Sequence, residues 1–415
     1  MVNIVSFSES VKLIKGEEGE MSKDKKVGSS NHRKLEYLIK HNPVIQSIYR
    51  NFVSFGFRVI SHFFAIDKKL VLMNGHGYKY NDSPREIYRK MHELGMTKKY
   101  RVVWALNEPE KTAIPGCKKI KMDTWEYFKT AFKAKYWISC VNIERSLRFK
   151  KKNQIYLNTW HGASINAAGN AVSGRKDFHW GYIDYFCVCG KPDEINYGRD
   201  FEVNEKAFLR VGYPRNDRLY HATKEEQVKL KEKLGLPLDK LCILYAPTWR
   251  DSNDGGRSYQ LAPPIDWEQW KEELSDEFVV MLRTHPYTTE LMNVQFDEFV
   301  RDYVEYPEVN DLLIATDILI SDYSSINLDY AITEKPMICF GYDYDEYIKY
   351  RGFYYDLQSE MPNGVMRDQK EILKHLKTLD YSAECDKTRR YKNKYMEYGG
   401  NATLECINTL FGTSF

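Results

Sequence analysis

The 415-residue sequence lacks the features that would assign it to a membrane-spanning, secreted or nucleic-acid-binding class. It has no run of about eighteen apolar residues, so no membrane-spanning helix is expected. Its first thirty or so residues contain no apolar signal-peptide core, which predicts an intracellular protein. The net charge is only +3, from 61 basic and 58 acidic residues, and this balance argues against a nucleic-acid partner.

Evenly spaced cysteines, internal repeats and long low-complexity tracts are also missing. Of the eight cysteines, Cys187 and Cys189 lie in an alternating run, which places both side chains on one face of a strand. They are therefore expected in a core, not in a metal site or a disulfide framework. No Asp-x-Asp pair follows a convincing strand end, so no resident cofactor or metal is predicted, although Asp322 or Asp329 could hold magnesium.

The chain does contain short apolar strands that alternate with helical segments, and its length favours two domains. This rhythm predicts parallel sheets in doubly wound α/β domains, with a ligand cleft at the carboxyl ends of the strands. The expected strands of the first domain are 70–73, 100–106, 136–140, 154–159, 185–190 and 207–211. Those of the second are 241–245, 278–283, 304–306, 318–321 and 336–339. Helices are expected at 83–94, 124–134 and 224–234.

Two segments precede these domains. Residues 1–34 are charged and poor in apolar positions, which predicts a disordered tether. Residues 35–66 repeat apolar side chains at helical spacing among basic ones, and Pro43 is expected to divide them into two helices. Such a segment can lie in the headgroup layer of an anionic membrane or pack on its own domain. The domains themselves are expected at 67–218 and 219–415.

Four polar clusters stand at the predicted strand ends. The first is Trp160-His161-Gly162, where a helix is expected over 163–170 and His161 suits a general base near neutral pH. The second contains Thr248 and Arg250, of which Arg250 can pair with phosphate or with Asp251. The third is Arg283-Thr-His285, and the fourth is the turn from Ser321 to Ser325.

The fourth cluster has the form of a phosphate site. A buried strand ends at Ser321 and Asp322, and a helix begins near Ser324 and Ser325, where unpaired backbone N–H groups gather. These groups, the helix dipole and the two hydroxyls could hold a diphosphate. The alternative is that the serines only cap the helix.

In this order, the clusters resemble the CDP-glycerol glycerophosphotransferases of Gram-positive teichoic acid synthesis. The resemblance extends from about Leu70 to about Phe353 and rests on Trp160-His161-Gly162, Ala246 to Asp251, Arg283-x-His285-Pro286, and Thr316 to Ser325 with Asp329. It implies a GT-B fold, in which two Rossmann-like domains face a central cleft and the C-terminal one holds the donor nucleotide. It also implies peripheral attachment to the cytoplasmic face of a bacterial membrane.

The implied reaction is attack by a lipid-linked acceptor hydroxyl on CDP-glycerol, with release of CMP. The resemblance assigns two catalytic histidines: His161 as the base, and His285 to bind the diphosphate and stabilise charge on the departing CMP. The residues expected to bind the donor are Thr248, Arg250, Arg283, Ser321, Asp322, Ser324, Ser325 and Asp329. Those expected to bind the acceptor are Trp160, Gly162, Asn74 and His76. The motifs do not separate glycerol from ribitol donors, or single addition from polymerisation.

One departure concerns the acceptor side. Relatives have a turn such as Glu-Ser-Phe after the first strand, whereas this chain has Asn74-Gly-His-Gly77. The glycines around His76 permit close approach to a ligand or simply a tight turn. Rival interpretations are a GT-B glycosyltransferase that uses a nucleotide sugar, a sugar-nucleotide epimerase, and a catalytically silent membrane-bound scaffold.

Overall fold

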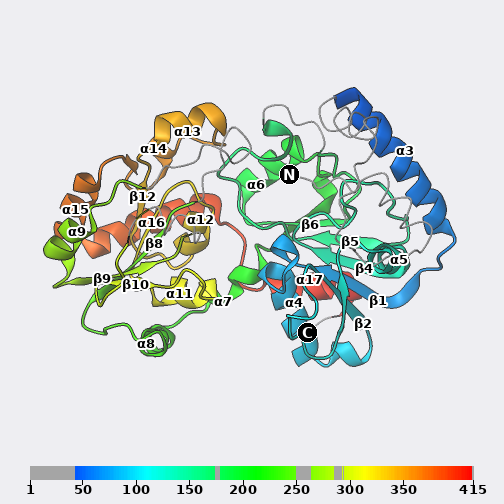
Figure 1. Ribbon diagram of the computed structural model, residues 1–415, viewed down its shortest axis with the longest axis horizontal. Coiled ribbons are helices and arrows are strands. Elements are labelled where there is room, and N and C mark those ends of the chain that lie inside the picture. The colour runs from blue at the N-terminus through cyan, green and yellow to red at the C-terminus, as the bar shows by residue number, and fades with distance from the viewer. Residues whose placement is uncertain (1–42, 173–177, 249–262, 285–291, 293, 414–415) are drawn as a thin grey trace, which may run out of the picture. The chain divides into compact units, whose positions relative to one another are not determined.

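The computed structural model describes residues 43–172, 178–248, 263–284, 292 and 294–413 (Figure 1). Its contacts divide the chain into two compact units. Unit 1 comprises Met1–His161, Ile183–Phe186 and Thr403–Phe415, and unit 2 comprises Gly162–Tyr182 and Cys187–Ala402. This partition differs from the expected boundary at residue 218, which stays a prediction. None of the described helices is both long and apolar enough to cross a membrane.

The first sheet has seven strands in the order β3-β2-β1-β4-β5-β6-β7. The strands are β1 (Asp67–Asn74), β2 (Arg101–Leu106), β3 (Lys118–Lys121), β4 (Ala134–Ser139), β5 (Ile155–Asn158), β6 (Tyr185–Val188) and β7 (Phe208–Arg210). The pairs from β3 through β6 are parallel, with Met73 opposite Trp104 and Ile138. β3 was not predicted, because three of its four residues are lysines, a composition typical of edge strands.

Helices pack on both faces of the strands of unit 1. Trp137 of β4 donates its indole N–H to Ala131 O of α5 (Trp125–Lys133), whereas the adjacent Tyr136 contacts Phe411 of α17 (Ala402–Phe411). Successive strand residues point to opposite faces, so α5 and α17 lie on opposite sides of β4. The other elements before β4 are α3 (Pro43–His62), η1 (His76–Tyr78), α4 (Asp82–Glu93) and η2 (Met96–Lys98).

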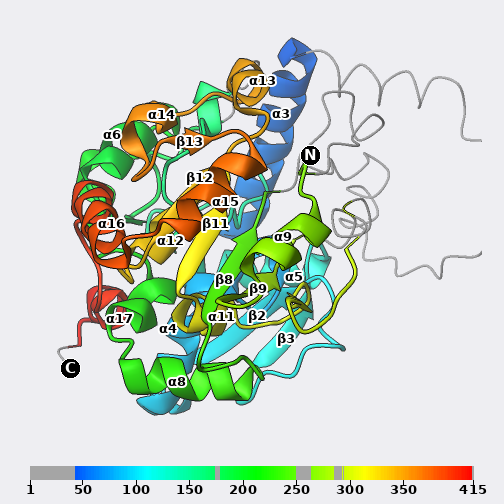
Figure 2. The same ribbon diagram turned by 90° about the vertical axis from the view of Figure 1, so that its left-hand side faces the viewer.

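The second sheet has six parallel strands in the order β10-β9-β8-β11-β12-β13, and all of these except β10 are labelled in Figure 2. The strands are β8 (Leu241–Ala246), β9 (Phe278–Leu282), β10 (Val300–Asp302), β11 (Ile318–Ser321), β12 (Met337–Phe340) and β13 (Val365–Met366). The helices of unit 2 are α6 (Lys191–Asp200), α7 (Asp217–Tyr220), α8 (Lys224–Lys233), α9 (Trp267–Leu274), α11 (Val309–Ala315), α12 (Ile326–Ala331), α13 (Tyr344–Tyr350), α14 (Leu357–Glu360), α15 (Gln369–Lys377) and α16 (Tyr381–Tyr395), with 3-10 turns η3 (Gly169–Ala171), η4 (Glu205–Ala207) and η5 (Pro214–Asn216).

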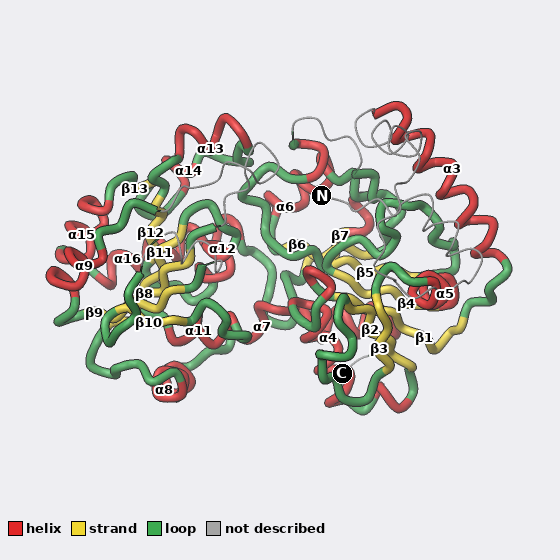
Figure 3. Tube along the Cα trace, in the orientation of Figure 1, coloured by secondary structure: helices red, strands yellow, loops and turns green. Residues whose placement is uncertain are grey.

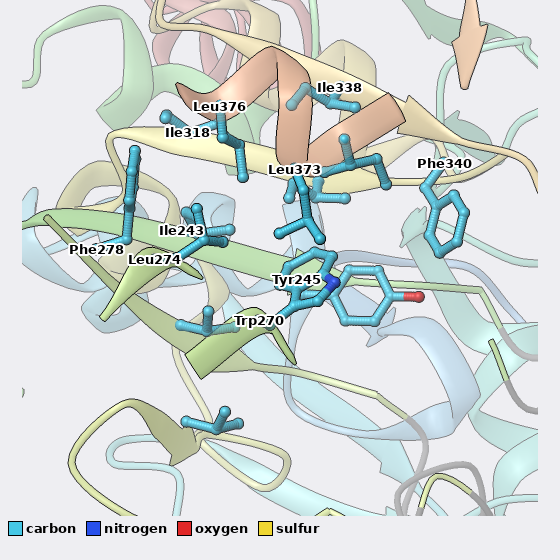
Figure 4. Packing of buried hydrophobic residues seen from close by; sticks show 14 of the residues in the cluster. Ile243, Tyr245, Trp270, Leu274, Phe278, Ile318, Ile338, Phe340, Leu373 and Leu376 are labelled. Carbon is cyan, nitrogen blue, oxygen red and sulfur yellow. The ribbon is translucent and has the colours of Figure 1, made fainter. Parts of the chain in front are cut away.

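One face of the second sheet is covered by α9 and α15. Alternate residues of the central strands, such as Ile243, Tyr245 and Ile318, pack there against Trp270 and Leu373, as Figure 4 shows. Trp270 and Ile243 are fully buried. This apolar layer makes the sheet a firm base for the polar residues that follow its strands.

Apart from the additional edge strand β7 of the first sheet, both sheets have the same strand order, which creates a reversal point in each (Figure 3). In the first sheet the chain runs outward from β1 to β3 and then returns to β4 on the other side of β1. In the second it runs from β8 to β10 and returns to β11. Ligands of such sheets bind beyond the carboxyl ends of the two strands that flank the reversal. The expected α/β fold with parallel sheets is therefore confirmed.

Two local expectations are wrong, and a third is tested only in part. The helix expected over 163–170 is wrong: residues 163–168 form a loop before η3, and its backbone bonds to 352–354 through Ala167 N to Gly352 O and Tyr354 N to Ile165 O. The strand expected over 304–306 is also wrong, because β10 lies at Val300–Asp302 and Tyr306 N closes a turn onto Tyr303 O. α3 begins at Pro43, and residues 35–42 lie outside the described part.

Candidate active site

His161 follows β5 in unit 1, and its ring orientation is defined by a backbone acceptor. Its Nδ1 lies 2.8 Å from Cys140 O, just beyond β4. A carbonyl oxygen can only accept, so Nδ1 carries the hydrogen. In the neutral ring the lone pair then resides on Nε2, which is the arrangement that a general base requires.

The backbone before His161 is held in an uncommon conformation. Trp160 has φ +50°, in the left-handed region that a bulky residue rarely adopts. Asn158 accepts the Trp160 N–H at 2.8 Å and donates its amide to Val141 O at 2.7 Å. Asn158 is fully buried, so these two hydrogen bonds are shielded from water. Backbone strain of this kind persists only where the surrounding contacts enforce it, as happens at functional sites.

His76 lies beside His161, with their ring centroids 4.6 Å apart. Its turn explains both neighbouring glycines. A Cβ at Gly75 would lie 2.4 Å from Lys79 O, and Gly77 has φ +60° with open space around it. The geometry of a tight turn thus accounts for both, without a ligand.

Asn74 ends β1 directly before this turn and is fully buried. Its Oδ1 accepts a short hydrogen bond from the hydroxyl of Ser139, at the end of β4. The two strands flank the reversal of the first sheet, so this bond joins their ends. Within the described residues, the Asn74 amide nitrogen has no hydrogen-bond partner.

The reversal of the second sheet carries a matching bond in unit 2. The Asp322 carboxylate, after β11, accepts from Thr248 N at 2.9 Å and from the Thr248 hydroxyl at 2.9 Å, after β8. Asp322 is 1% exposed, and Ser321, also buried, donates its hydroxyl to Ala246 O. The side chains of Ser321 and Asp322 therefore stabilise the turn through hydrogen bonds to Ala246 and Thr248.

The two serines of the turn differ. Ser324 Oγ accepts from Ile326 N at 3.2 Å, a capping bond at the start of α12. Ser325 occupies the N-cap position, yet its hydroxyl makes no side-chain capping bond. The Gly162 backbone lies against it, because a Cβ at Gly162 would be 2.8 Å from Ser325 Oγ. The capping alternative thus describes Ser324 and leaves Ser325 available for another role.

Arg283 follows β9, the neighbour of β8, and is a half-buried cation without an acidic partner among the described residues. Its Nη1 donates to Tyr303 O and Tyr306 O, at 3.2 and 2.6 Å. Burial lowers the pKa of Arg283. By contrast, hydrogen bonds to Glu194 and Glu334 raise the pKa of Arg210 and Arg389, respectively. Arg283 is thus suited to receive an anion.

Asp329 was expected to bind the donor, and its carboxylate has protein partners. Arg215 Nη2 lies 3.0 and 3.1 Å from its two oxygens, and Asn216 Nδ2 lies 2.6 Å from one. Sequence reasoning gave Arg215 and Asn216 no role. The position of Arg215 directly after Gly212-Tyr-Pro214 was the sequence feature that could have indicated such a role.

Arg250 and His285 lie outside the described residues. The described residues contain no group of three or more His, Cys, Asp or Glu that could hold a metal ion. Cys187 and Cys189 are fully buried and take part in no disulfide among the described residues, as expected for core positions.

Residues 55–412 match the family described as CDP-Glycerol:Poly(glycerophosphate) glycerophosphotransferase. The chain is 31% identical over 335 residues to a teichoic acid poly(glycerol phosphate) polymerase of Staphylococcus epidermidis, covering 75% of this chain and 46% of that protein. It is 30% identical over 336 residues to a teichoic acid glycerol-phosphate transferase of Staphylococcus aureus, covering 74% of this chain and 83% of that one.

Among solved structures, the wall teichoic acid polymerase TagF superposes with a TM-score of 0.76 at 28% identity, covering 92% of this chain and 98% of that one. That crystal held a histidine-to-asparagine variant soaked with CDPG. The chain thus spans about half the length of the S. epidermidis relative and nearly all of the TagF chain in the crystal.

Proposed function

Because this chain belongs to the CDP-glycerol:poly(glycerophosphate) glycerophosphotransferase family, we propose that it transfers glycerol phosphate, or a related polyol phosphate, from CDP-glycerol to the hydroxyl of a lipid-linked acceptor. CMP is the leaving group. The reaction serves the synthesis of teichoic acid or a related cell-surface polymer. The observation that carries the proposal is the defined tautomer of His161, the candidate base in unit 1. Unit 2 separately presents Arg283 and Ser325 at a strand edge that is suited to an anion.

The donor diphosphate is assigned to the carboxyl edge of the second sheet. Three adjacent strands, β9, β8 and β11, end there in Arg283, Thr248 and the turn that contains Ser325. α12 has only six residues, so its backbone N–H groups and the Ser325 hydroxyl matter more than a long helix dipole. The unpaired part of the Arg283 guanidinium supplies positive charge. We assign Ser321, Asp322 and Asp329 the role of stabilising the structure of this edge through their hydrogen bonds.

The transfer step begins at the acceptor hydroxyl. Its oxygen forms a bond to the phosphorus that bears glycerol, its proton passes to Nε2 of His161, and the bond from that phosphorus to the bridging oxygen breaks. The electron pair leaves on CMP, whose phosphate gains negative charge. Arg283 stabilises that charge, and His285 and Arg250 are proposed to assist it. No residue set is assigned to a metal, and the role of magnesium stays a prediction.

The acceptor is assigned to the strand ends of unit 1, where Asn74, His76 and Trp160 accompany His161, with Gly162 following in the chain. This division corresponds to the GT-B plan, with the acceptor on the N-terminal Rossmann-like domain and the donor on the C-terminal one.

Helix α3 supports a peripheral membrane location at the cytoplasmic face. Its large apolar side chains Ile48, Phe52, Phe55 and Val59, with Phe63 just beyond, are between 45% and 82% exposed and recur at helical spacing. The opposite face packs on unit 1, where the Phe57 ring lies 4.9 Å from Phe128 and the Ser54 hydroxyl accepts from Arg148 N. An exposed apolar stripe on a firmly packed helix fits insertion into the headgroup layer.

The product assay that tests the reaction uses CDP-glycerol labelled in the glycerol and a defined lipid-linked disaccharide. Labelled lipid and an equal amount of CMP are expected, and product sizing separates single addition from polymerisation. Parallel reactions with CDP-ribitol identify the polyol. Transfer from a UDP-sugar with release of UDP, and none from either CDP-polyol, would favour a nucleotide-sugar glycosyltransferase and overturn the proposal.

The membrane assignment is tested by pelleting with anionic liposomes. Replacing Phe52, Phe55 and Phe63 with serine is expected to move the protein from pellet to supernatant without unfolding it, because these rings are exposed. Leu238→Ser, which removes an apolar side chain that is 55% exposed elsewhere, is the matched control. Pelleting of the triple variant as complete as that of the control would contradict the assignment.

A further inference from the structure

The loop that follows His161 is held by one buried face of helix α6. Tyr197 donates its hydroxyl to Gly162 O at 2.6 Å. Asp193 Oδ1 accepts from Ser164 N at 2.9 Å, and Asn196 donates its amide to Ser164 Oγ at 3.0 Å. The three α6 residues occupy positions i, i+3 and i+4, so they share one side of the helix.

These polar groups are deeply buried. Tyr197 is 1% exposed, Asp193 is 2% exposed and Asn196 is 7% exposed. Burial of polar groups costs stability unless each finds a partner, and a helix face that only packs is normally apolar. Here all three side chains form hydrogen bonds to Gly162 or Ser164, which lie one and three residues after His161. The arrangement therefore specifies the position of this loop more closely than apolar packing would.

The number of hydroxyl hydrogens decides which tyrosine donates to the Gly162 carbonyl. The Tyr213 hydroxyl lies 2.5 Å from Asp193 Oδ2 and 3.4 Å from Gly162 O. One hydroxyl has one hydrogen, and the shorter bond to the carboxylate takes it. Tyr197 is thus the hydroxyl that donates to the Gly162 carbonyl, while Tyr213 and the backbone N–H and thiol of Cys189 donate to Asp193 Oδ2.

The same loop also contacts the turn from Ser321 to Ser325. Asn166 donates its amide to Tyr323 O at 2.9 Å, and Gly162 packs against Ser325. On its other side, the residue before His161 is the strained Trp160. A strained segment returns to a commoner conformation when its restraints are removed. The bond from Tyr197 is one such restraint, located one residue after the base.

We propose that Tyr197 is a positioning residue for the transfer reaction: its hydroxyl holds the Gly162 carbonyl and thereby keeps the His161 imidazole in its reactive orientation. Asn196, through Ser164, adds a weaker restraint of the same kind. This inference rests on the proposed function for its rate effect, and on the chain geometry alone for its effect on His161.

The test compares Tyr197→Phe with Tyr381→Phe. The control also loses one hydroxyl that donates to a backbone carbonyl, Asp317 O at 3.2 Å, but elsewhere in unit 2. For Tyr197→Phe we expect kcat to fall roughly tenfold while KM for CDP-glycerol stays within about twofold, because misplacement of a catalytic group acts on the transition state. Ser164→Ala, a milder change, should give a smaller loss, and Tyr381→Phe none.

A second readout does not depend on turnover. Carbethoxylation of His161 by diethyl pyrocarbonate, followed by mass spectrometry, should be about 3- to 10-fold faster in Tyr197→Phe than in wild type, the range that corresponds to one net hydrogen bond. Tyr381→Phe should match wild type. A folded Tyr197→Phe protein with the wild-type labelling rate would overturn the positioning role. A wild-type chain that labels as expected but does not use CDP-polyols would instead count against the proposed function.

Discussion

The two sheet reversals are built alike but present different chemistry. In each, a hydrogen bond joins the ends of the two flanking strands: Ser139 to Asn74 in unit 1, and Thr248 to Asp322 in unit 2. Beyond the first bond lie two imidazole rings, and beyond the second lie a serine turn and a cation without an acidic partner among the described residues. The same strand order thus occurs twice with different residues after the strands, and we propose that the edge in unit 1 handles a proton and the edge in unit 2 a phosphate.

The largest effect is expected from removing the base. His161→Ala should lower the transfer rate by at least about a hundredfold with the fold intact, which is the usual cost of losing a positioned general base. His221→Ala is the matched control, because that exposed ring also bonds to a backbone carbonyl, Gly400 O at 2.6 Å. A folded His161→Ala protein that turns over at near the wild-type rate would remove His161 from this role.

A smaller effect is expected at the anion-receptive edge. Arg283→Met should weaken CDP-glycerol binding roughly 10- to 100-fold, since hydrogen bonds to charged groups contribute about 1.5–3 kcal/mol. Arg301→Met is the control, because that exposed guanidinium also bonds to backbone carbonyls, Gly235 O and Glu298 O. Equilibrium dialysis with labelled donor measures both, and equal affinity in the two variants would show that Arg283 only supports its own loop.

The smallest effects separate the two serines. Ser325→Ala should weaken donor binding by about 3- to 10-fold with little change in stability, because its hydroxyl makes no capping bond. Ser324→Ala should instead cost about 1 kcal/mol of unfolding free energy, as loss of a cap does. Donor titration and urea unfolding of both variants give the comparison. The reverse pattern would mean that the turn orients its hydroxyls differently when the donor is bound.

The sequence was sufficient to place most strands and the polar clusters after them. Apolar runs such as 241–245 and 318–321 mark buried strands, and local patterns of this kind persist in the fold. The helix expected over 163–170 failed because the hydrogen bonds of that loop go to 352–354, far along the chain.

The hydrogen-bond partners of individual side chains could likewise not be predicted from the sequence. Ser321, Asp322 and Asp329 stand in the motif beside Ser325, yet their polar atoms bond within unit 2 to Ala246, Thr248 and Arg215. Spacing predicts that a hydroxyl or carboxylate lies at a strand end. Which group it bonds to depends on residues brought near by folding, so supporting and ligand-facing residues look alike in the sequence.

The most direct test of the account is a calorimetric titration of CDP-glycerol into His161→Ala. If proton handling and phosphate binding belong to separate strand edges, the variant should bind the donor with a Kd within about twofold of wild type while transfer is largely lost, because the base acts only in the transition state. A loss of donor affinity as large as the loss of rate would contradict this separation and assign His161 to donor binding.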